Sequence, residues 1–310
     1  MFLTDLSCCL KFKSDPPEKD IRMNEPQIVF AEVDPEARFG LPCGRNTNPS
    51  NVVCFFLAIL FTIGFYALCL FLWKLGLDER IWSWSVGTDF YYIPIGIAFL
   101  TAWSCAILMM KSLKVRAQRK ALSLRLLPEQ AGFVLTRGTV DDVLAHIEKQ
   151  IIGADRFTLV YRVMMGLRSA KNTGRIAETD TVIESIAESD ESIMESGYTI
   201  VRGFIWAIPV IGFIGTIIGL TIAIGNFASI LPEPGSASGL DPEKLTSGLG
   251  NVIGGLNTAF VTTGEALICA LLVQLLLTFV RSGDESFLDD CRRYTSRHVL
   301  PRLRIEKDEG

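Results

Sequence analysis

The stretch Trp206-Ala-Ile-Pro-Val-Ile-Gly-Phe-Ile-Gly-Thr-Ile-Ile-Gly-Leu-Thr-Ile-Ala-Ile224 decides the fold of this chain. No charged side chain occurs from residue 203 to residue 230, and a helix needs only about 20 consecutive apolar residues to cross a bilayer. We therefore predict that this segment spans a membrane. On a helical wheel its small residues form a seam about 80° wide. The seam consists of Pro209, Gly212, Thr216, Gly219 and Ala223. Such a seam either lets another helix pack closely or lines a narrow passage, and both interpretations stay open here.

Three further apolar blocks indicate a polytopic membrane protein. They cover residues 52–73, residues 91–110, and a stretch that begins within 249–256 and ends at Val280. Charged segments separate these blocks, and the mean hydropathy of the whole chain is positive at +0.34. We therefore expect an all-α polytopic membrane protein with four transmembrane helices, in which long helices extend into the cytoplasm.

Basic residues set the predicted orientation. Between the second span and Glu129 the chain carries Lys and Arg but no acidic residue, and arginines again follow the last span from Arg281 onward. Such flanks lie in the cytoplasm by the positive-inside rule, which places both termini there. The predicted organisation is a cytoplasmic N-terminal arm (1–51), a first transmembrane hairpin (52–112), a cytoplasmic helical region (113–202), a core hairpin (203–281) and a cytoplasmic tail (282–310).

The segments outside the spans differ in their expected order. Residues 1–51 are rich in Pro, Asp, Glu, Lys and Asn and show no sustained period, which predicts a loosely ordered arm. From 176 to 195, isoleucines alternate with glutamates as in an amphipathic helix with an acidic face. Since no proline occurs in this region before Pro209, we expect one helix to run from it into the third span.

The sequence carries no signature of an enzyme, a metal site or a nucleic-acid-binding surface. The eight cysteines show no CxxC spacing and at least four lie in apolar spans, so we expect free thiols; acylation of Cys8 and Cys9 stays open. Neither His146 nor His298 has a second candidate ligand three or four residues further along the chain. No Gly-rich phosphate loop and no HExxH set occurs. We therefore expect no enzymatic activity, no metal, no cofactor and no nucleic-acid partner.

The fourth span carries a polar stripe about 60° wide on a helical wheel. The stripe consists of Asn251, Thr258, Thr262, Glu265 and Cys269. A carboxylate at membrane depth costs about 3 kcal/mol, so Glu265 must face protein or water. Two interpretations follow: Glu265 belongs to an ion pathway, or it is protonated and hydrogen-bonded and holds neighbouring helices together.

Two motifs occur in the third and fourth spans. The first, Pro-x-x-Gly-x-x-Gly-Thr-x-x-Gly, consists of Pro209, Gly212, Gly215, Thr216 and Gly219. The second, Ala-Phe-x-Thr-Thr-x-x-Ala-Leu, consists of Ala259, Phe260, Thr262, Thr263, Ala266 and Leu267. Each motif alone is weak because Gly and Thr are common in membrane helices. The two motifs in this order, separated by a short polar loop, are more specific. Together they resemble the core helices of the MotA/TolQ/ExbB proton-channel family over roughly residues 175–285.

The resemblance implies which residues form the site. Thr216, Thr262 and Thr263 match the family's pore threonines, and Glu265 and Thr258 are added as pathway candidates. Thr258 stands where ExbB- and TolQ-like members have a glutamate. An alternative register places the family's Glu-Ala-Leu-Ile on residues 265–268 and Ala270 at the threonine position. Thr263 lies about 100° from Thr262 on the wheel, so one of the two faces a neighbouring subunit.

The resemblance also implies a function and partners. The expected protein is a homopentameric ring in the bacterial inner (plasma) membrane that surrounds an ExbD-, TolR- or MotB-like single-span protein. As the channel subunit of an ion-motive-force-driven motor, it would pass protons or sodium to an aspartate of that partner. The alternative is a non-conducting oligomeric scaffold, in which the seam and Glu265 only hold helices together.

Overall fold

The computed structural model describes residues 28–38, 40, 47–76, 92–123, 126, 135, 137–228 and 242–303. Four of the helices in these residues are long and apolar enough to cross a membrane. They are α4 (Asn51–Lys74), α6 (Tyr92–Arg119), α10 (Thr199–Ala228) and α11 (Pro242–Tyr294). The predicted all-α polytopic fold is therefore confirmed. Cys8 and Cys9, for which acylation stays open, and residues 231–240 of the short polar loop between the two motifs lie outside the described residues.

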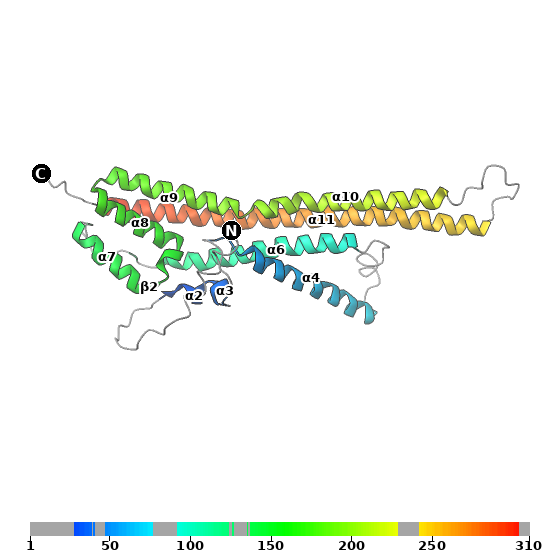
Figure 1. Cartoon of the computed structure of the whole chain (residues 1–310), viewed down its shortest axis with the longest axis horizontal. Helices are drawn as coiled ribbons and strands as arrows, with labels where there is room; N and C mark the ends of the chain where they lie inside the picture. The colour runs from blue at the N-terminus through cyan, green and yellow to red at the C-terminus, as the bar shows by residue number, and fades with distance from the viewer. Residues whose placement is uncertain are drawn as a thin grey trace. The chain divides into compact units, whose positions relative to one another are not determined.

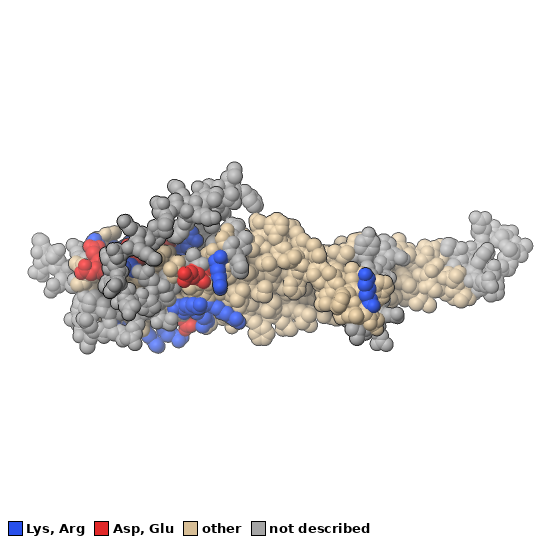
Figure 2. Space-filling model, turned by 90° about the horizontal axis from the view of Figure 1, so that it is seen from below, with Lys and Arg blue, Asp and Glu red and all other residues tan. Residues whose placement is uncertain are grey.

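The chain divides into two compact units, which we call the charged unit and the spanning unit. The charged unit comprises Met1–Cys54, Ile107–Thr199 and Thr278–Gly310, and the spanning unit comprises Phe55–Ala106 and Ile200–Leu277. On the face drawn in Figure 2, Lys, Arg, Asp and Glu gather over the charged unit, whereas the surface of the spanning unit carries almost none. A bilayer requires this distribution, because an ionised side chain in hydrocarbon is costly.

The spanning unit is held together by apolar contacts between α6, α10 and α11. Figure 1 shows α10 and α11 side by side. The shared core consists of Ile93, Ile97, Ile208, Ala266 and Ala270. Helix α4 joins through aromatic contacts, since the Phe55 ring lies 5.0 Å from that of Trp103, which in turn lies 4.9 Å from Phe204 of α10. Large apolar side chains remain exposed on all four helices, as expected for surface that faces lipid or further chains.

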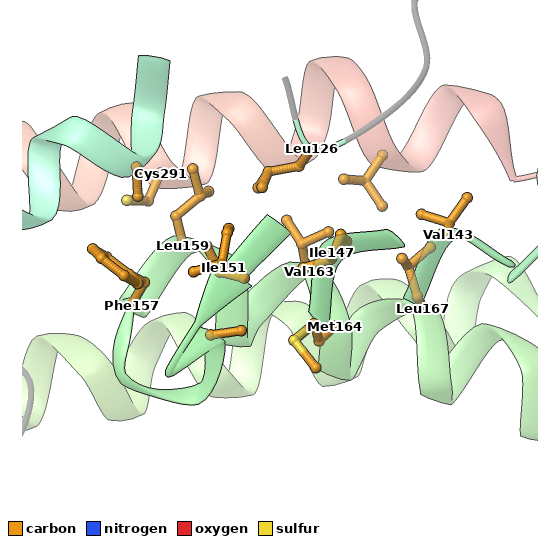
Figure 3. Packing of buried hydrophobic residues seen from close by; sticks show 14 of the residues in the cluster. Leu126, Val143, Ile147, Ile151, Phe157, Leu159, Val163, Met164, Leu167 and Cys291 are labelled. Atoms are coloured by element: carbon orange, nitrogen blue, oxygen red, sulfur yellow. The ribbon is translucent and has the colours of Figure 1, made fainter. Parts of the chain in front are cut away.

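The charged unit is built from three shorter helices around the ends of α6 and α11. These helices are α7 (Arg137–Gln150), α8 (Thr158–Thr173) and α9 (Ile176–Ser196). Figure 3 shows its core, in which Leu159 and Val163 of α8 point towards Leu126 and Cys291. Short elements complete the unit: β1 (Ile28–Val29), α2 (Phe30–Val33), α3 (Pro35–Arg38), η1 (Lys120–Ser123), β2 (Ile151–Ile152), η2 (Ala154–Arg156), η3 (Thr295–Val299) and η4 (Leu300–Arg302).

The prediction of a loosely ordered N-terminal arm is wrong for residues 28–38 and 47–50. Strand β1 pairs in parallel with β2, and the Phe30 ring packs edge-on against Phe157 at 5.2 Å. Asp34 and Glu36 are buried as well. Only four consecutive apolar residues begin this segment, too few to produce a detectable period, and the strand that pairs with them lies more than 100 residues further along the chain.

The expected helix from residue 176 into the third span is present, but a two-residue turn interrupts it. The chain follows one helical path from Ile176 to Ala228, yet α9 ends at Ser196 and α10 begins at Thr199. Pro209 lies inside α10 without ending it. The turn at Gly197 and Tyr198 has no proline to cause it, so its cause lies in tertiary contacts.

Candidate functional site

The seam of α10 packs against α11 within one chain. A Cβ atom added at Gly212 would lie 2.4 Å from Ala266 Cβ, and one at Gly219 would lie 2.7 Å from the carbonyl oxygen of Gly255. One at Gly215 would lie 2.5 Å from Thr262 Oγ1. Any side chain larger than a hydrogen atom would therefore push the two helices apart. Along these three glycines the seam is a packing surface and contains no open passage.

Thr216 of α10 and Thr263 of α11 face each other across this seam, and their hydroxyl groups are hydrogen-bonded. Thr263 Oγ1 lies 3.1 Å from the carbonyl oxygens of Gly212 and Ala259, and Thr216 Oγ1 lies 3.3 Å from that of Ala259. One hydroxyl therefore donates to the other, and the second donates to a carbonyl. Both side chains are only partly buried, so the pair can exchange one of these bonds for a bond to water or an ion.

Thr262 has a different role from its neighbour. Its side chain is fully buried, and its hydroxyl donates within α11, at 3.0 Å to the carbonyl oxygen of Thr258 and 3.2 Å to that of Ala259. The same oxygen closes the space beside Gly215. Of the two adjacent threonines, Thr263 meets Thr216 and Thr262 fills the helix interface. The wheel separated the two threonines by about 100° and predicted that one of them faces a neighbouring subunit, yet within one chain both lie against α10, Thr262 beside Gly215 and Thr263 against Thr216.

Glu265 lies on a different face of α11 from the Thr216–Thr263 pair. Its carboxyl is partly buried and acts electrostatically on Tyr66 of α4 and on Cys269 one turn further along α11. The Tyr66 hydroxyl is buried and, within the described residues, has no hydrogen-bond partner. The structure therefore places Glu265 towards the first hairpin. Sequence reasoning put Glu265 and the threonines in one pathway, and the geometry separates them.

Thr258 lies at one end of the seam, where α10 and α11 leave an open polar groove. Its hydroxyl donates 3.1 Å to the carbonyl oxygen of Gly254. Asn226 and Asn251 line the same groove with the glycines between them. Thr258 is therefore near water-accessible polar surface, but it does not contact the Thr216–Thr263 pair.

Sequence reasoning missed a buried polar cluster in the charged unit. The Lys111 ammonium is fully buried, lies 3.3 Å from Asp284 Oδ2 and 4.1 Å from the centre of the Tyr198 ring, and donates to Asn48 Oδ1 at 2.6 Å. The Tyr198 hydroxyl donates 2.7 Å to Asp284 Oδ2. Burial lowers the pKa of Lys111 and raises the pKa of Asp284, and the ion pair opposes both shifts. A second buried ion pair joins Lys114 Nζ to Glu36 Oε2 at 2.6 Å.

These arrangements support binding and packing chemistry. Among the described residues no group of His, Cys, Asp and Glu is suited to hold a metal ion. The Thr216–Thr263 pair offers hydroxyl oxygens and carbonyl oxygens at one point, which can solvate a proton or a dehydrated cation.

The segment that carries both motifs was compared with known protein families. Residues 159–292 match the model of the MotA/TolQ/ExbB proton channel family. The resemblance predicted from the two motifs is thereby confirmed. The matched segment begins in α8, includes α9 and α10, and ends near the end of α11, so it contains Thr216, Thr263 and Glu265. Comparison with curated proteins and with solved structures gave no significant match.

Proposed function

We propose that this chain is the channel subunit of a motor driven by an ion-motive force. It would pass protons, or sodium ions, between a ring of its copies and a transmembrane aspartate of a partner protein. The observation that carries the proposal is the Thr216–Thr263 pair, because it supplies exchangeable hydroxyl groups within the segment that matches a proton channel family. As a channel subunit the chain would catalyse no covalent reaction.

The surroundings of the pair support this role. Positions on α10 one turn from Thr216 carry Phe213 and Leu220, which are 61% and 38% exposed. Positions on α11 around Thr263 carry Phe260 and Leu267, which are 66% and 56% exposed. The pair is thus a small polar point in an otherwise apolar face. Such a face is dry except where a hydroxyl can hold water or an ion, which is the arrangement that a selective passage requires.

A single copy would leave this face against lipid, so we expect further copies to cover it. By analogy with the family, five copies would form the ring and an ExbD-, TolR- or MotB-like single-span protein would occupy its centre. The ring would lie in the bacterial inner membrane with both termini in the cytoplasm. One elementary charge crossing 100 mV releases about 2.3 kcal/mol, so a few ions per step suffice for mechanical work on the partner.

Flux in proteoliposomes that contain the chain and its partner tests the proposal. Thr216→Val and Thr263→Val should each reduce proton flux at least tenfold, because valine keeps the shape of threonine and removes the hydroxyl. Thr221→Val is the matched control, since Thr221 lies on the same helix, is exposed, and within the described residues donates to the carbonyl oxygen of Ile217 at 2.8 Å and to no residue of α11. Ring assembly is measured on the same samples by native mass spectrometry. Unchanged flux with intact rings would refute the proposal.

The alternative is a non-conducting oligomeric scaffold. The close contacts at Gly212, Gly215 and Gly219 favour it, because they explain the glycine motif by helix packing alone. Under this alternative the parent protein shows no flux with its partner, and the three valine variants behave alike. Glu265→Gln tests whether Glu265 takes part in conduction. Because Glu265 lies away from the Thr216–Thr263 pair, flux should persist in this variant if the pair alone conducts.

A further inference from the structure

The turn between α9 and α10 has unusual backbone bonding. The N–H of Gly197 donates 3.2 Å to the carbonyl oxygen of Met194, and that of Tyr198 donates 3.0 Å to that of Glu195. These bonds reach back three residues, whereas an α-helix reaches back four, so the carbonyl of Ile193 loses its helical donor. Gly197 itself has φ −66° and ψ −17°, which are helical values. The local sequence therefore permits a continuous helix here.

The N-terminal arm supplies the bonds that the turn lacks. Asn48 Nδ2 donates 2.7 Å to the carbonyl oxygen of Ile193, alongside the Ser196 hydroxyl at 2.7 Å. Lys111 Nζ donates 3.1 Å to the carbonyl oxygen of Met194 and 2.6 Å to Asn48 Oδ1. The Asn48 amide thus occupies the position at which the Gly197 N–H would otherwise bond. A side chain 145 residues away stabilises the turned form of the joint.

The joint also excludes any residue larger than glycine at position 197. A Cβ atom there would lie 2.0 Å from Asn48 Oδ1, 2.6 Å from Asn48 Cγ and 2.8 Å from Lys111 Nζ. Gly197 is therefore required by the close approach of Asn48. Alanine at this position would favour the continuous helix by propensity and would expel Asn48 by contact.

Separate contacts hold the arm in this place. Lys114 Nζ lies 2.6 Å from Glu36 Oε2 and 3.3 Å from the carbonyl oxygen of Asn48, and Glu36 Oε1 accepts a bond of 2.7 Å from the Ser50 N–H. The arm is thus tied to α6 on both sides of Asn48. The bound position of the arm therefore depends on a few polar contacts, which a competing ligand or protein can replace.

We propose that the arm is a strap that switches the joint between α9 and α10. With Asn48 seated, the joint is turned; with Asn48 withdrawn, the Gly197 N–H bonds the Ile193 carbonyl and the two helices become one. This inference does not depend on ion conduction, so it can hold or fail independently of the proposed function.

Distance measurements on the full chain in nanodiscs test the switch. Spin labels replace Glu188 of α9 and Trp206 of α10, two exposed positions that are eighteen residues apart and therefore on the same face of a continuous helix. In Asn48→Ala and in Gly197→Ala the distance distribution should sharpen at the backbone separation of a straight helix, about 27 Å at 1.5 Å per residue. Asn51→Ala is the matched control, because Asn51 is exposed three residues away, and it should keep the parent distribution.

A double-mutant comparison distinguishes a specific clash with Asn48 from a general loss of stability in the variants. If the cost of Gly197→Ala comes mainly from the clash with Asn48, the substitution should lower the unfolding midpoint strongly in the parent and much less in the Asn48→Ala background, where only the flexible end of Lys111 still lies within 2.8 Å of the added Cβ. Equal losses in both backgrounds would overturn the strap. Distance distributions that stay alike in the parent and all variants would overturn the switch.

Discussion

Replacing Gly219 by alanine should destabilise the spanning unit by a predictable amount. The added Cβ would lie 2.7 Å from the carbonyl oxygen of Gly255 and 2.9 Å from the backbone nitrogen of Ala259, whereas ordinary contact begins at 3.4 Å. Both neighbours are backbone atoms, which cannot rotate away. The helices must therefore separate by about 0.7 Å, and a gap of this size removes a quarter to a half of the dispersion energy of the surrounding contacts.

Overpacking of this kind costs about 1–3 kcal/mol, a large part of the stability of a typical fold. The measurement is equilibrium unfolding in mixed micelles with increasing sodium dodecyl sulfate, followed by tryptophan fluorescence. Gly225→Ala is the control, because Gly225 lies on the same helix and an added Cβ would meet nothing within 4 Å. It should leave stability unchanged or raise it by up to about 1 kcal/mol, because alanine favours a helix over glycine. If Gly219→Ala is no worse than Gly225→Ala, the close packing of α10 on α11 is refuted.

Further predictions concern the charged unit. Lys111→Met should cost about 3–5 kcal/mol because it leaves Asp284 buried without its cation, whereas Arg281→Met, which breaks exposed pairs, should cost less than about 1 kcal/mol in the same unfolding assay. A further exchange, Asp284→Leu added to Lys111→Met, should recover most of that loss. Phe30→Ala should release the arm from Phe157, which is measured as faster proteolysis before α4 at a protease concentration that leaves the parent intact. Burial raises the pKa of Cys291 to about 12, so only about one thiol in 10⁴ is ionised at pH 8; mass spectrometry should find Cys291 alkylated in denatured protein and unmodified in folded protein.

The spans and the seam could be predicted from the sequence because the bilayer imposes them directly. A span must be long and uncharged, and two helices that pack closely without a hydrophobic driving force need small residues at the contact. Gly212 and Gly219 therefore signal a contact by their type and spacing alone. Both motifs lie within residues 159–292, the segment that matches the channel family.

The positions of Thr263 and Glu265 could not be predicted in the same way. A helical wheel gives the angle between side chains on one helix, but it does not give the direction of the neighbouring helices. Thr262, Glu265 and Thr258 share a stripe on the wheel, yet Thr262 faces α10 while Glu265 interacts with Tyr66 of α4. Only the packing of α4, α6 and α10 around α11 separates these roles.

The contacts of the N-terminal arm were missed for another reason. Asn48 and Ile193 are 145 residues apart, and a single polar side chain in a segment rich in Pro, Asp and Asn has no period that would reveal its partner. The one local signal is Gly197. A lone glycine in an amphipathic helix costs about 1 kcal/mol relative to alanine, so its presence indicates a packing requirement that the pattern itself does not explain.

Lys111 and Lys114 connect the orientation of the chain with its stability. Both contributed to the basic flank that predicts a cytoplasmic location, yet both are buried and paired with Asp284 and Glu36. These two roles are compatible, because orientation is decided while the chain inserts, before the pairs have formed. After folding, Arg116 and Lys120 are exposed among the described members of this flank. Lys111→Met should therefore destabilise the charged unit without inverting the chain, and labelling of single cysteines from either side of the membrane separates these two effects.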